Sequence, residues 1–288
     1  MIGASVITRG GLHNGFTWAR LWGCECVQMY LAPSRTWHVP ELSQAEVDAF
    51  LTAQRTSGIA TVVAHASLLL NLASANDGVR DHSIAHLKTE MRRANLFGVD
   101  RIVVHPGSHE HPSTGINRIV SALDEVVHAI PNVRVLLETV AGQGNAIGAT
   151  FEELAEIVDG CAQPDRFGIC IDTCHVFAAG YDVRLYSGLA NTLDQCSRTI
   201  GLDRIGCFHF NDSKGILGSR VDRHMPMIGQ GQIGTAAFHA LLRDERFVGV
   251  PIIIEPPDGE NTTRANLDLL KSLRDREAPV EEQLTTLF

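Results

Sequence analysis

The residues best suited to chemistry in this chain are histidines and carboxylates that each follow an apolar, β-rich segment. A lone histidine at a strand end is usually a hydrogen-bonded structural residue, and a carboxylate there can cap the next helix. Six such residues, spaced about one strand and one helix apart, instead favour a shared metal site. Imidazole and carboxylate together suit zinc or manganese better than calcium. The six residues are His65, His105, Glu138, Asp172, His209 and Glu255.

Three further residues extend this set. His175 lies one helical turn after Asp172, and Asp222 and His224 flank Arg223 in a long connection, where an extended backbone would point both side chains to one side. Nine ligands are enough for three ions that share carboxylates and too many for one. Two ions about 3.5–4 Å apart activate water and stabilise both oxygens of a phosphoryl displacement. Hydrolysis of a phosphate ester is therefore favoured over redox chemistry.

The remaining histidines and the cysteines are weaker candidates. We expect four histidines to lie in loops or on a helix surface; these are His82, His86, His109 and His111. Two cysteine pairs, Cys24 with Cys26 and Cys170 with Cys174, resemble metal pairs but have no matching second pair. We expect both to be thiols in or near the core.

The elements that must position these ligands alternate between strand-like and helix-like segments. Eight such strands over 288 residues predict a (β/α)8 TIM barrel in a single domain, residues 1–288, with a doubly wound open sheet as the main alternative. In a barrel the six ligands would meet at the carboxyl ends of the strands. Ser43 with Glu46 and Thr150 with Glu153 predict helix starts with capping boxes. The expected strands are Ile2–Ile7, Cys24–Leu31, Ala60–Ala64, Arg101–Val104, Val133–Leu137, Phe167–Ile171, Ile205–Phe208 and Val250–Ile254. The expected helices include Ser43–Thr56, Asp81–Phe97, Ile116–Ile130, Thr150–Gly160, Leu185–Ile200 and Asn261–Arg276.

Composition narrows the class of protein. No segment is long and apolar enough to span a membrane, and no secretory leader is evident. Seven scattered cysteines suit reduced thiols, so we expect a cytoplasmic protein. The formal net charge of −9 at first argues against a nucleic-acid partner.

Long, ordered motifs give the chain a family resemblance. It resembles endonuclease IV, the zinc-dependent abasic-site endonucleases of base-excision repair, from its first residues to about Glu255. The motifs that carry the resemblance include Ile2-Gly3-Ala4, His65-Ala66-Ser67, His105-Pro106-Gly107-Ser108-His109, Glu138-Thr139-Val140-Ala141-Gly142-Gln143-Gly144, Asp172-Thr173-Cys174-His175, His209-Phe210-Asn211-Asp212-Ser213-Lys214 and Gly218-Ser219-Arg220-Val221-Asp222-Arg223-His224.

The resemblance implies a TIM-barrel monomer with three zinc ions, and manganese possible at some sites. It implies that His65 and His105 hold one ion, bridged by Glu138 to a second ion on Asp172, His209 and Glu255. His175, Asp222 and His224 would hold the third. The implied reaction cuts duplex DNA on the 5′ side of an abasic site, leaves a 3′-hydroxyl and is accompanied by trimming of blocked 3′ ends. Glu138 and Glu255 would serve catalysis by positioning the ions and the nucleophile.

The departures from the family pattern fall where DNA should bind. Leu68 stands where the family commonly has the tyrosine of a wedge, and Ser5 stands where it often has a histidine. Leu68 and Leu69 can still form an apolar wedge, or Leu68–Leu70 can be buried core at a helix start. The expected DNA contacts are Arg35, Trp37, Leu68, Leu69, Asn71, Lys214, Arg220 and Arg223.

Two other functions share these features. A xylose-isomerase-like sugar isomerase or epimerase would have the barrel and a metal-binding rim with fewer ions, and a lesion-binding protein would bind damaged DNA without cutting it. Three zinc ions would bring the net charge of −9 to about −3 and make the ligand cluster positive. The acidity therefore predicts that DNA binding is confined to the metal-bearing rim.

Overall fold

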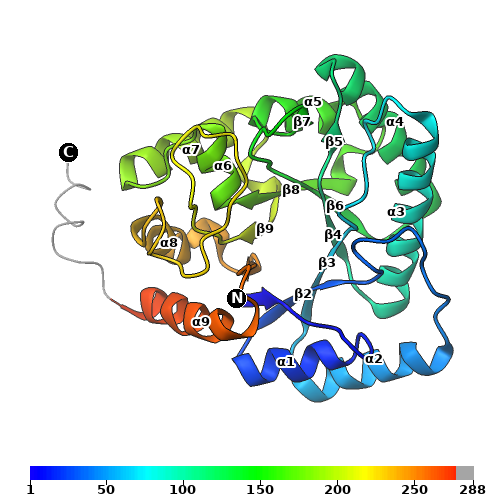
Figure 1. The fold of residues 1–288 in the computed structure, drawn as a ribbon, viewed down its shortest axis with the longest axis horizontal. Helices are drawn as coiled ribbons and strands as arrows, with labels where there is room; N and C mark the ends of the chain where they lie inside the picture. The colour runs from blue at the N-terminus through cyan, green and yellow to red at the C-terminus, as the bar shows by residue number, and fades with distance from the viewer. Residues whose placement is uncertain (277–288) are drawn as a thin grey trace.

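A closed parallel barrel forms the centre of the computed structural model, which describes residues 1–276. The strands run through the middle and helices surround them (Figure 1). The predicted TIM barrel is confirmed, and the open-sheet alternative is wrong because the first and last strands pair with each other. Residues 277–288 of the predicted domain lie outside the described residues. The barrel strands are β1 (Ile2–Ser5), β2 (Cys26–Tyr30), β3 (Thr61–His65), β4 (Arg101–Val104), β6 (Arg134–Glu138), β8 (Phe167–Asp172), β9 (Ile205–His209) and β10 (Ile252–Ile254).

Helices follow the strands and cover the outside of the barrel. They are α1 (Asn14–Trp22), α2 (Gln44–Ser57), α3 (Asp77–Phe97), α4 (Pro112–Ala129), α5 (Phe151–Gly160), α6 (Thr173–Ala179), α7 (Tyr186–Thr199), α8 (Ala236–Arg243) and α9 (Glu260–Asp275). A small antiparallel pair, β5 (Gly107–Ser108) with β7 (Ala146–Ile147), joins two of the connections. Among the described residues, no helix is long and apolar enough to cross a membrane.

The predicted helix starts are partly confirmed. Ser43 and Glu46 form a complete capping box at the start of α2. Thr150 caps α5 by accepting from the N–H of Glu153, but the carboxylate of Glu153 accepts instead from the N–H groups of Gly148 and Ala149. Glu153 thereby fixes the turn that precedes the helix. The start of α3 was predicted too late, because Asn76 caps it by accepting from Val79 N–H.

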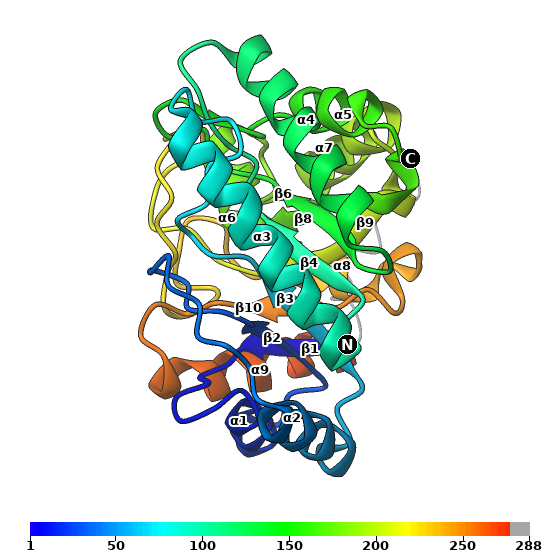
Figure 2. The ribbon, with the colours of Figure 1, turned by 90° about the vertical axis from the view of Figure 1, so that its right-hand side faces the viewer.

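Alternate residues of the strands point into the barrel and fill it with a small buried layer, while a larger core lies between the strands and the helices. β1 contributes only Gly3 near this layer, because a Cβ there would lie 1.8 Å from the carbonyl oxygen of Cys26. The layer consists of Cys26, Val63, Val103, Leu136, Cys170, Cys207 and Ile253. In Figure 2 the long connections after β2 (blue) and after β9 (yellow) lie on the same side of the barrel.

Candidate metal centre at the carboxyl ends of the strands

The six predicted strand-end ligands meet at one end of the barrel. Each lies two positions after a member of the buried layer, so each points inward on the same face of its strand. His65, Glu138, Asp172 and His209 are the last residues of their strands, and His105 and Glu255 directly follow β4 and β10. The predicted strands stopped one residue short of all six, whereas the structure includes four of them in the strands.

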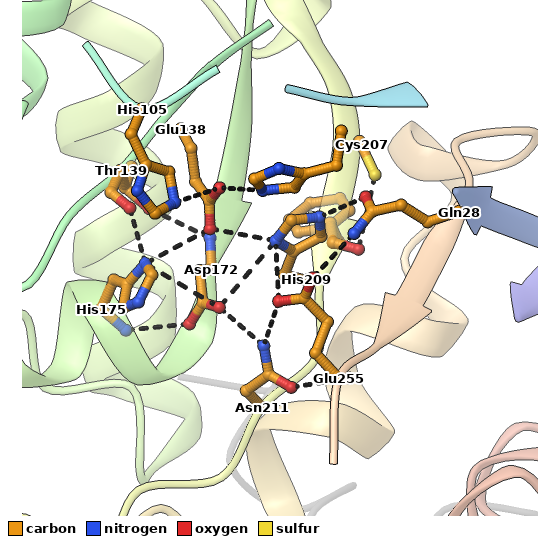
Figure 3. A network of polar contacts seen from close by, with 12 residues as sticks. Gln28, His105, Glu138, Thr139, Asp172, His175, Cys207, His209, Asn211 and Glu255 are labelled. Carbon is orange, nitrogen blue, oxygen red and sulfur yellow. Dashed lines mark hydrogen bonds and ion pairs between the residues drawn. The ribbon is translucent and has the colours of Figure 1, made fainter. Parts of the chain in front are cut away.

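Glu138 lies at the centre of the group and is 1% exposed. Its Oε2 oxygen is 3.2 Å from Nε2 of His65 and 2.9 Å from Nε2 of His105. Its Oε1 oxygen is 3.0 Å from Nδ1 of His209. The two oxygens therefore face two different sets of nitrogen ligands, as a carboxylate does when it bridges two ions (Figure 3).

The second set surrounds His209. Its Nδ1 atom lies 3.4 Å from Oε2 of Glu255 and 4.0 Å from Oδ2 of Asp172, in addition to Glu138. The ligand atoms of these four residues all lie within 4.8 Å of one another. Three carboxylates around one imidazole nitrogen form a donor set that suits a divalent cation.

The third set includes the late loop. Nε2 of His175 lies 3.3 Å from Oδ2 of Asp222, and Nε2 of His224 lies 3.3 Å from Oδ1 of the same residue and 3.6 Å from Asp172 Oδ2. The spacing of Asp222 and His224 suggested an extended strand, but the two residues lie in a loop. Within it, His224 forms a single isolated β-bridge with Ser213. The loop curves so that both side chains nevertheless face His175.

Hydrogen bonds to main-chain carbonyls leave one ring nitrogen free in two of the histidines. The ring of His65 bonds through Nδ1 to the carbonyl of Ala66 at 2.7 Å, and that of His175 bonds through Nδ1 to the carbonyl of Thr139 at 2.8 Å. Because a carbonyl only accepts, both Nδ1 atoms carry hydrogen and both Nε2 atoms can bind a metal. Nε2 of His224 is buried, and although Oδ1 of Asp222 lies 3.3 Å away, no hydrogen bond reaches this nitrogen in the described structure. This orphaned nitrogen and the donor set fit metal ions.

The charges of the cluster shift its pKa values strongly. Burial alone would raise the pKa of Glu138, but His209 and His105 outweigh it and hold that pKa well below its ordinary value. Burial alone would lower the pKa of His209, but Glu255 and Glu138 raise it well above its ordinary value. Burial alone would also lower the pKa of His175, but Asp172 and Asp222 raise it well above its ordinary value. The cluster therefore favours ionised carboxylates with positive charge between them.

Three polar residues that hold the ligands were not assigned a role in the sequence analysis. Gln28 is fully buried and contacts His209 and Glu255. Asn211 donates to Asp172 at 2.6 Å and accepts from the backbone N–H of Glu255. The only sequence signal for Gln28 is a polar residue inside an apolar strand, and Asn211 stands within a recognised motif.

Asp212, the third of these residues, organises the loop that carries Asp222 and His224. Its carboxylate is fully buried and accepts from four backbone N–H groups, at 2.8 to 3.0 Å. The four donors are Ser213, Gly229, Gly231 and Ile233. A single side chain thus ties both ends of the loop to the end of β9.

The expected DNA contacts lie around the same end of the barrel, with differing exposure. Arg35, Lys214, Arg220 and Arg223 are exposed. Arg220 has a φ of 54°, a conformation that costs free energy in a residue with a side chain. Its N–H donates to the carbonyl of Ala178 at 2.9 Å, which holds it there.

The three leucines in the turn after β3, which were candidates for a DNA wedge or for buried core, differ in exposure. Leu68 is 43% exposed and Leu69 is half-buried, whereas Leu70 is 7% exposed and belongs to the core. Only Leu70 is therefore buried core, and the expected helix start at this place is wrong, because α3 begins at Asp77. Asn71 is half-buried and bonds to the backbone and side chain of Ser108, so it links two connections.

Trp37 is 42% exposed, and its ring lies 5.9 Å from that of His82 and 5.8 Å from that of His86. The expectation that His86 lies in a loop or on a helix surface is wrong. His86 is buried and pairs with the buried Glu90 at 3.6 Å, because that face of α3 packs under the connection after β2.

All seven cysteines are free and buried, as expected of core thiols. Two groups nevertheless approach the candidate ligands: Cys170 and Cys207 lie near His209, and Cys174 lies near Asp222 and His224, in each case with ligand atoms within 4.8 Å.

Comparison with known proteins gives a consistent set of relatives. The family model described as xylose isomerase-like TIM barrel matches residues 16–273. A protein of Trichlorobacter lovleyi named probable endonuclease 4 is 44% identical over 278 residues, which cover 94% of this chain and 99% of the relative. A protein of Geotalea daltonii with the same name is 41% identical, over 95% of this chain and 97% of the relative.

Solved structures agree with these relatives. The crystal structure of endonuclease IV from Thermus thermophilus superposes with a TM-score of 0.84 at 34% identity, over 94% of this chain and 98% of that one. A D-tagatose 3-epimerase-like protein superposes with a TM-score of 0.75 at 22% identity, over 98% and 99% of the two chains. At that identity the second likeness concerns the fold alone.

Proposed function

The chain belongs to the endonuclease IV family of the xylose isomerase-like TIM barrels, and on that premise we propose that it cuts duplex DNA on the 5′ side of abasic sites and leaves a 3′-hydroxyl. Trimming of blocked 3′ ends belongs to the same proposal. The observation that carries it is the convergence of nine imidazole and carboxylate side chains around the buried Glu138. We propose that the protein acts as a monomer in the cytoplasm.

Three zinc ions, with manganese as a substitute at some sites, are the proposed cofactors. The first would be held by His65, His105 and Glu138, the second by Glu138, Asp172, His209 and Glu255, and the third by Asp172, His175, Asp222 and His224. Bound divalent ions supply an activated water and neutralise the charge that develops on the phosphate oxygens.

The chain's own residues have separate tasks in this proposal. Glu138 holds the first two ligand sets at a fixed separation, because one rigid carboxylate faces both. Glu255 is half-buried, and its carboxylate is 19% exposed against 1% for Glu138, so it would orient the attacking water. The exposed Arg35, Lys214, Arg220 and Arg223 would contact DNA phosphates, which fixes position without reading base sequence.

The apolar and amide residues of the rim complete the proposal. Leu68, Leu69 and Trp37 would pack against the unstacked bases at the lesion, since apolar wedges kink duplexes. Asn71 would act through its bonds to Ser108, which hold the connection after β3 beside the connection after β4. A lesion recognised in this way is detected by its deformability rather than by base edges.

A duplex with a single abasic site, labelled at its 5′ end, tests the proposal. The zinc-loaded protein should shorten the labelled strand to a product that a DNA polymerase extends, because the product ends in a 3′-hydroxyl. Prior chelation should abolish cutting, and zinc should restore it. An uncut duplex, or a product that cannot be extended, would refute the proposed reaction. Tight binding without cutting would support the lesion-binding alternative.

A further inference from the structure

Gln28 lies in the ligand layer of the barrel although it is not itself a metal-ligand type. It stands two positions after Cys26, just as each strand-end ligand stands two positions after its own member of the buried layer. Its side chain is 0% exposed, in the middle of a strand that is otherwise apolar except at its end. Figure 3 shows it entering from β2 toward His209 and Glu255. A buried amide at this place needs partners for both its donor and its acceptor.

Both partners are residues of the metal centre. The Nε2 atom of Gln28 donates to Oε1 of Glu255 at 2.7 Å. Its Oε1 atom lies 2.8 Å from Nε2 of His209. The reversed amide would place its oxygen against an ionised carboxylate, which can only accept, so this contact fixes the orientation of the amide.

The amide orientation determines the tautomer of His209. Since the Gln28 oxygen can only accept, Nε2 of His209 must carry a hydrogen. In the neutral ring that binds a metal, the unprotonated nitrogen is then Nδ1, the atom that faces Glu138 at 3.0 Å, Glu255 at 3.4 Å and Asp172 at 4.0 Å. Main-chain carbonyls do the same for His65 and His175, where they bond Nδ1 and leave Nε2 free. The side-chain oxygen of Gln28 thus fixes the tautomer of His209, as main-chain carbonyl oxygens fix the tautomers of His65 and His175.

We propose that Gln28 is a positioning residue that holds His209 as the Nε2–H tautomer and ties it to Glu255, so that both present their metal-binding atoms to the second ion. This role rests on the proposed zinc centre. Residues that orient a metal-binding histidine in this way change metal affinity by about 10- to 100-fold when they are replaced.

The test compares Gln28→Leu, which keeps most of the volume and removes the amide, with Gln28→Glu, which keeps an acceptor for His209 but repels Glu255. Cys26→Ala is the matched control, because Cys26 is equally buried on the same face of β2 and contacts carbonyl groups rather than ligands. Zinc binding to each chelated protein is measured by competition with a chelator of known affinity. Long-range ¹H–¹⁵N spectra of the zinc-loaded proteins report the tautomer of His209.

We expect Gln28→Leu to weaken binding of one zinc ion by about 10- to 100-fold and to remove the Nε2–H signal of His209. Gln28→Glu should keep that signal and still weaken zinc binding, and Cys26→Ala should change neither. Unchanged zinc binding and an unchanged His209 spectrum in Gln28→Leu would overturn the inference while leaving the proposed function intact. A wild-type protein that binds no zinc would instead overturn the proposed function, and the role of Gln28 with it.

Discussion

Oε1 of Glu138 lies 3.0 Å from Nδ1 of His209, although the two residues are 71 positions apart in the chain. The other oxygen of Glu138 faces His65 and His105. The buried carboxylate of Glu138 therefore links ligands from three other strand ends. This arrangement makes Glu138 the residue on which the proposed chemistry depends most.

Glu138→Gln should remove most of the incision activity. The substitution keeps the shape of the side chain but removes the charge shared by two ligand sets. We expect a loss of about 4 kcal/mol of transition-state stabilisation, or roughly 1,000-fold in kcat/KM, together with reduced zinc content. Glu125→Gln, on the surface beside Lys88, is the control and should change neither quantity. Near wild-type kcat/KM in Glu138→Gln would contradict the bridging role.

Zinc binding should release protons near neutral pH. Burial alone would lower the pKa of His175 and of His209, but the surrounding carboxylates raise both well above 6.5. Their protonated forms therefore stabilise the folded, metal-free protein below about pH 6.5, and this contribution is lost as the pH rises through the raised values. Because zinc binds the neutral ring, its apparent affinity should increase with pH over the same interval. A pH indicator in weak buffer should report proton release that scales with bound zinc; zinc binding without proton release would be inconsistent with these shifts.

Asp212→Asn should loosen the loop that carries Asp222 and His224. An asparagine can accept at one oxygen only, so N–H groups now bonded to the second oxygen would lose their partner. Unpaired buried donors cost about 1–3 kcal/mol each. We expect a lower free energy of unfolding and selective loss of one zinc ion, measured by denaturation and by metal analysis. If the variant kept all its zinc, the loop would be held by other contacts.

Leu68→Ala and Leu70→Ala should separate DNA binding from stability. Leu68 is 43% exposed and Leu70 is 7% exposed. Leu70→Ala should lower the free energy of unfolding by about 2–5 kcal/mol, whereas Leu68→Ala should change it by less than about 0.5 kcal/mol. Leu68→Ala should nevertheless weaken binding to an abasic duplex more than to an intact one. Equal weakening for both duplexes would show that Leu68 is not a lesion wedge.

The double variant Lys214→Ala, Arg220→Ala should weaken DNA binding in a salt-dependent way. Each phosphate contact that is lost reduces the slope of log affinity against log salt by about 1. Arg55→Ala is the control, since Arg55 is in the last turn of α2, before β3 begins, and so lies at the opposite end of the barrel. An unchanged salt slope in the double variant would place the phosphate contacts elsewhere on the rim.

The barrel and its nine candidate ligands were predictable because both depend on local patterns. Apolar strands end in ligand residues, and parallel strands of a barrel end on the same side. Three of the described helices were not named in advance: α1, α6 and α8. α1 and α8 lack a side-chain cap, and α6 and α8 are only 7 and 8 residues long. A weak start signal on a short helix leaves little to detect.

Long-range contacts account for what the sequence analysis missed. Gln28 contacts the ring of His209, which is 181 positions away in the chain, and no sequence spacing predicts that contact. His86 was expected in a loop or on a helix surface. It is buried because the connection after β2, which is distant in sequence, covers that face of α3. The curvature of the loop at Asp222 likewise follows from the four hydrogen bonds to Asp212.

The sharpest test of a three-ion centre is the dependence of incision on the amount of bound zinc. The chelated protein is loaded stepwise with zinc, and incision of the abasic duplex is measured at each ratio of bound zinc to chain. We expect incision to reach its plateau only as the third ion binds. A plateau at one ion per chain, or full incision by the chelated protein, would contradict a centre built from all nine side chains.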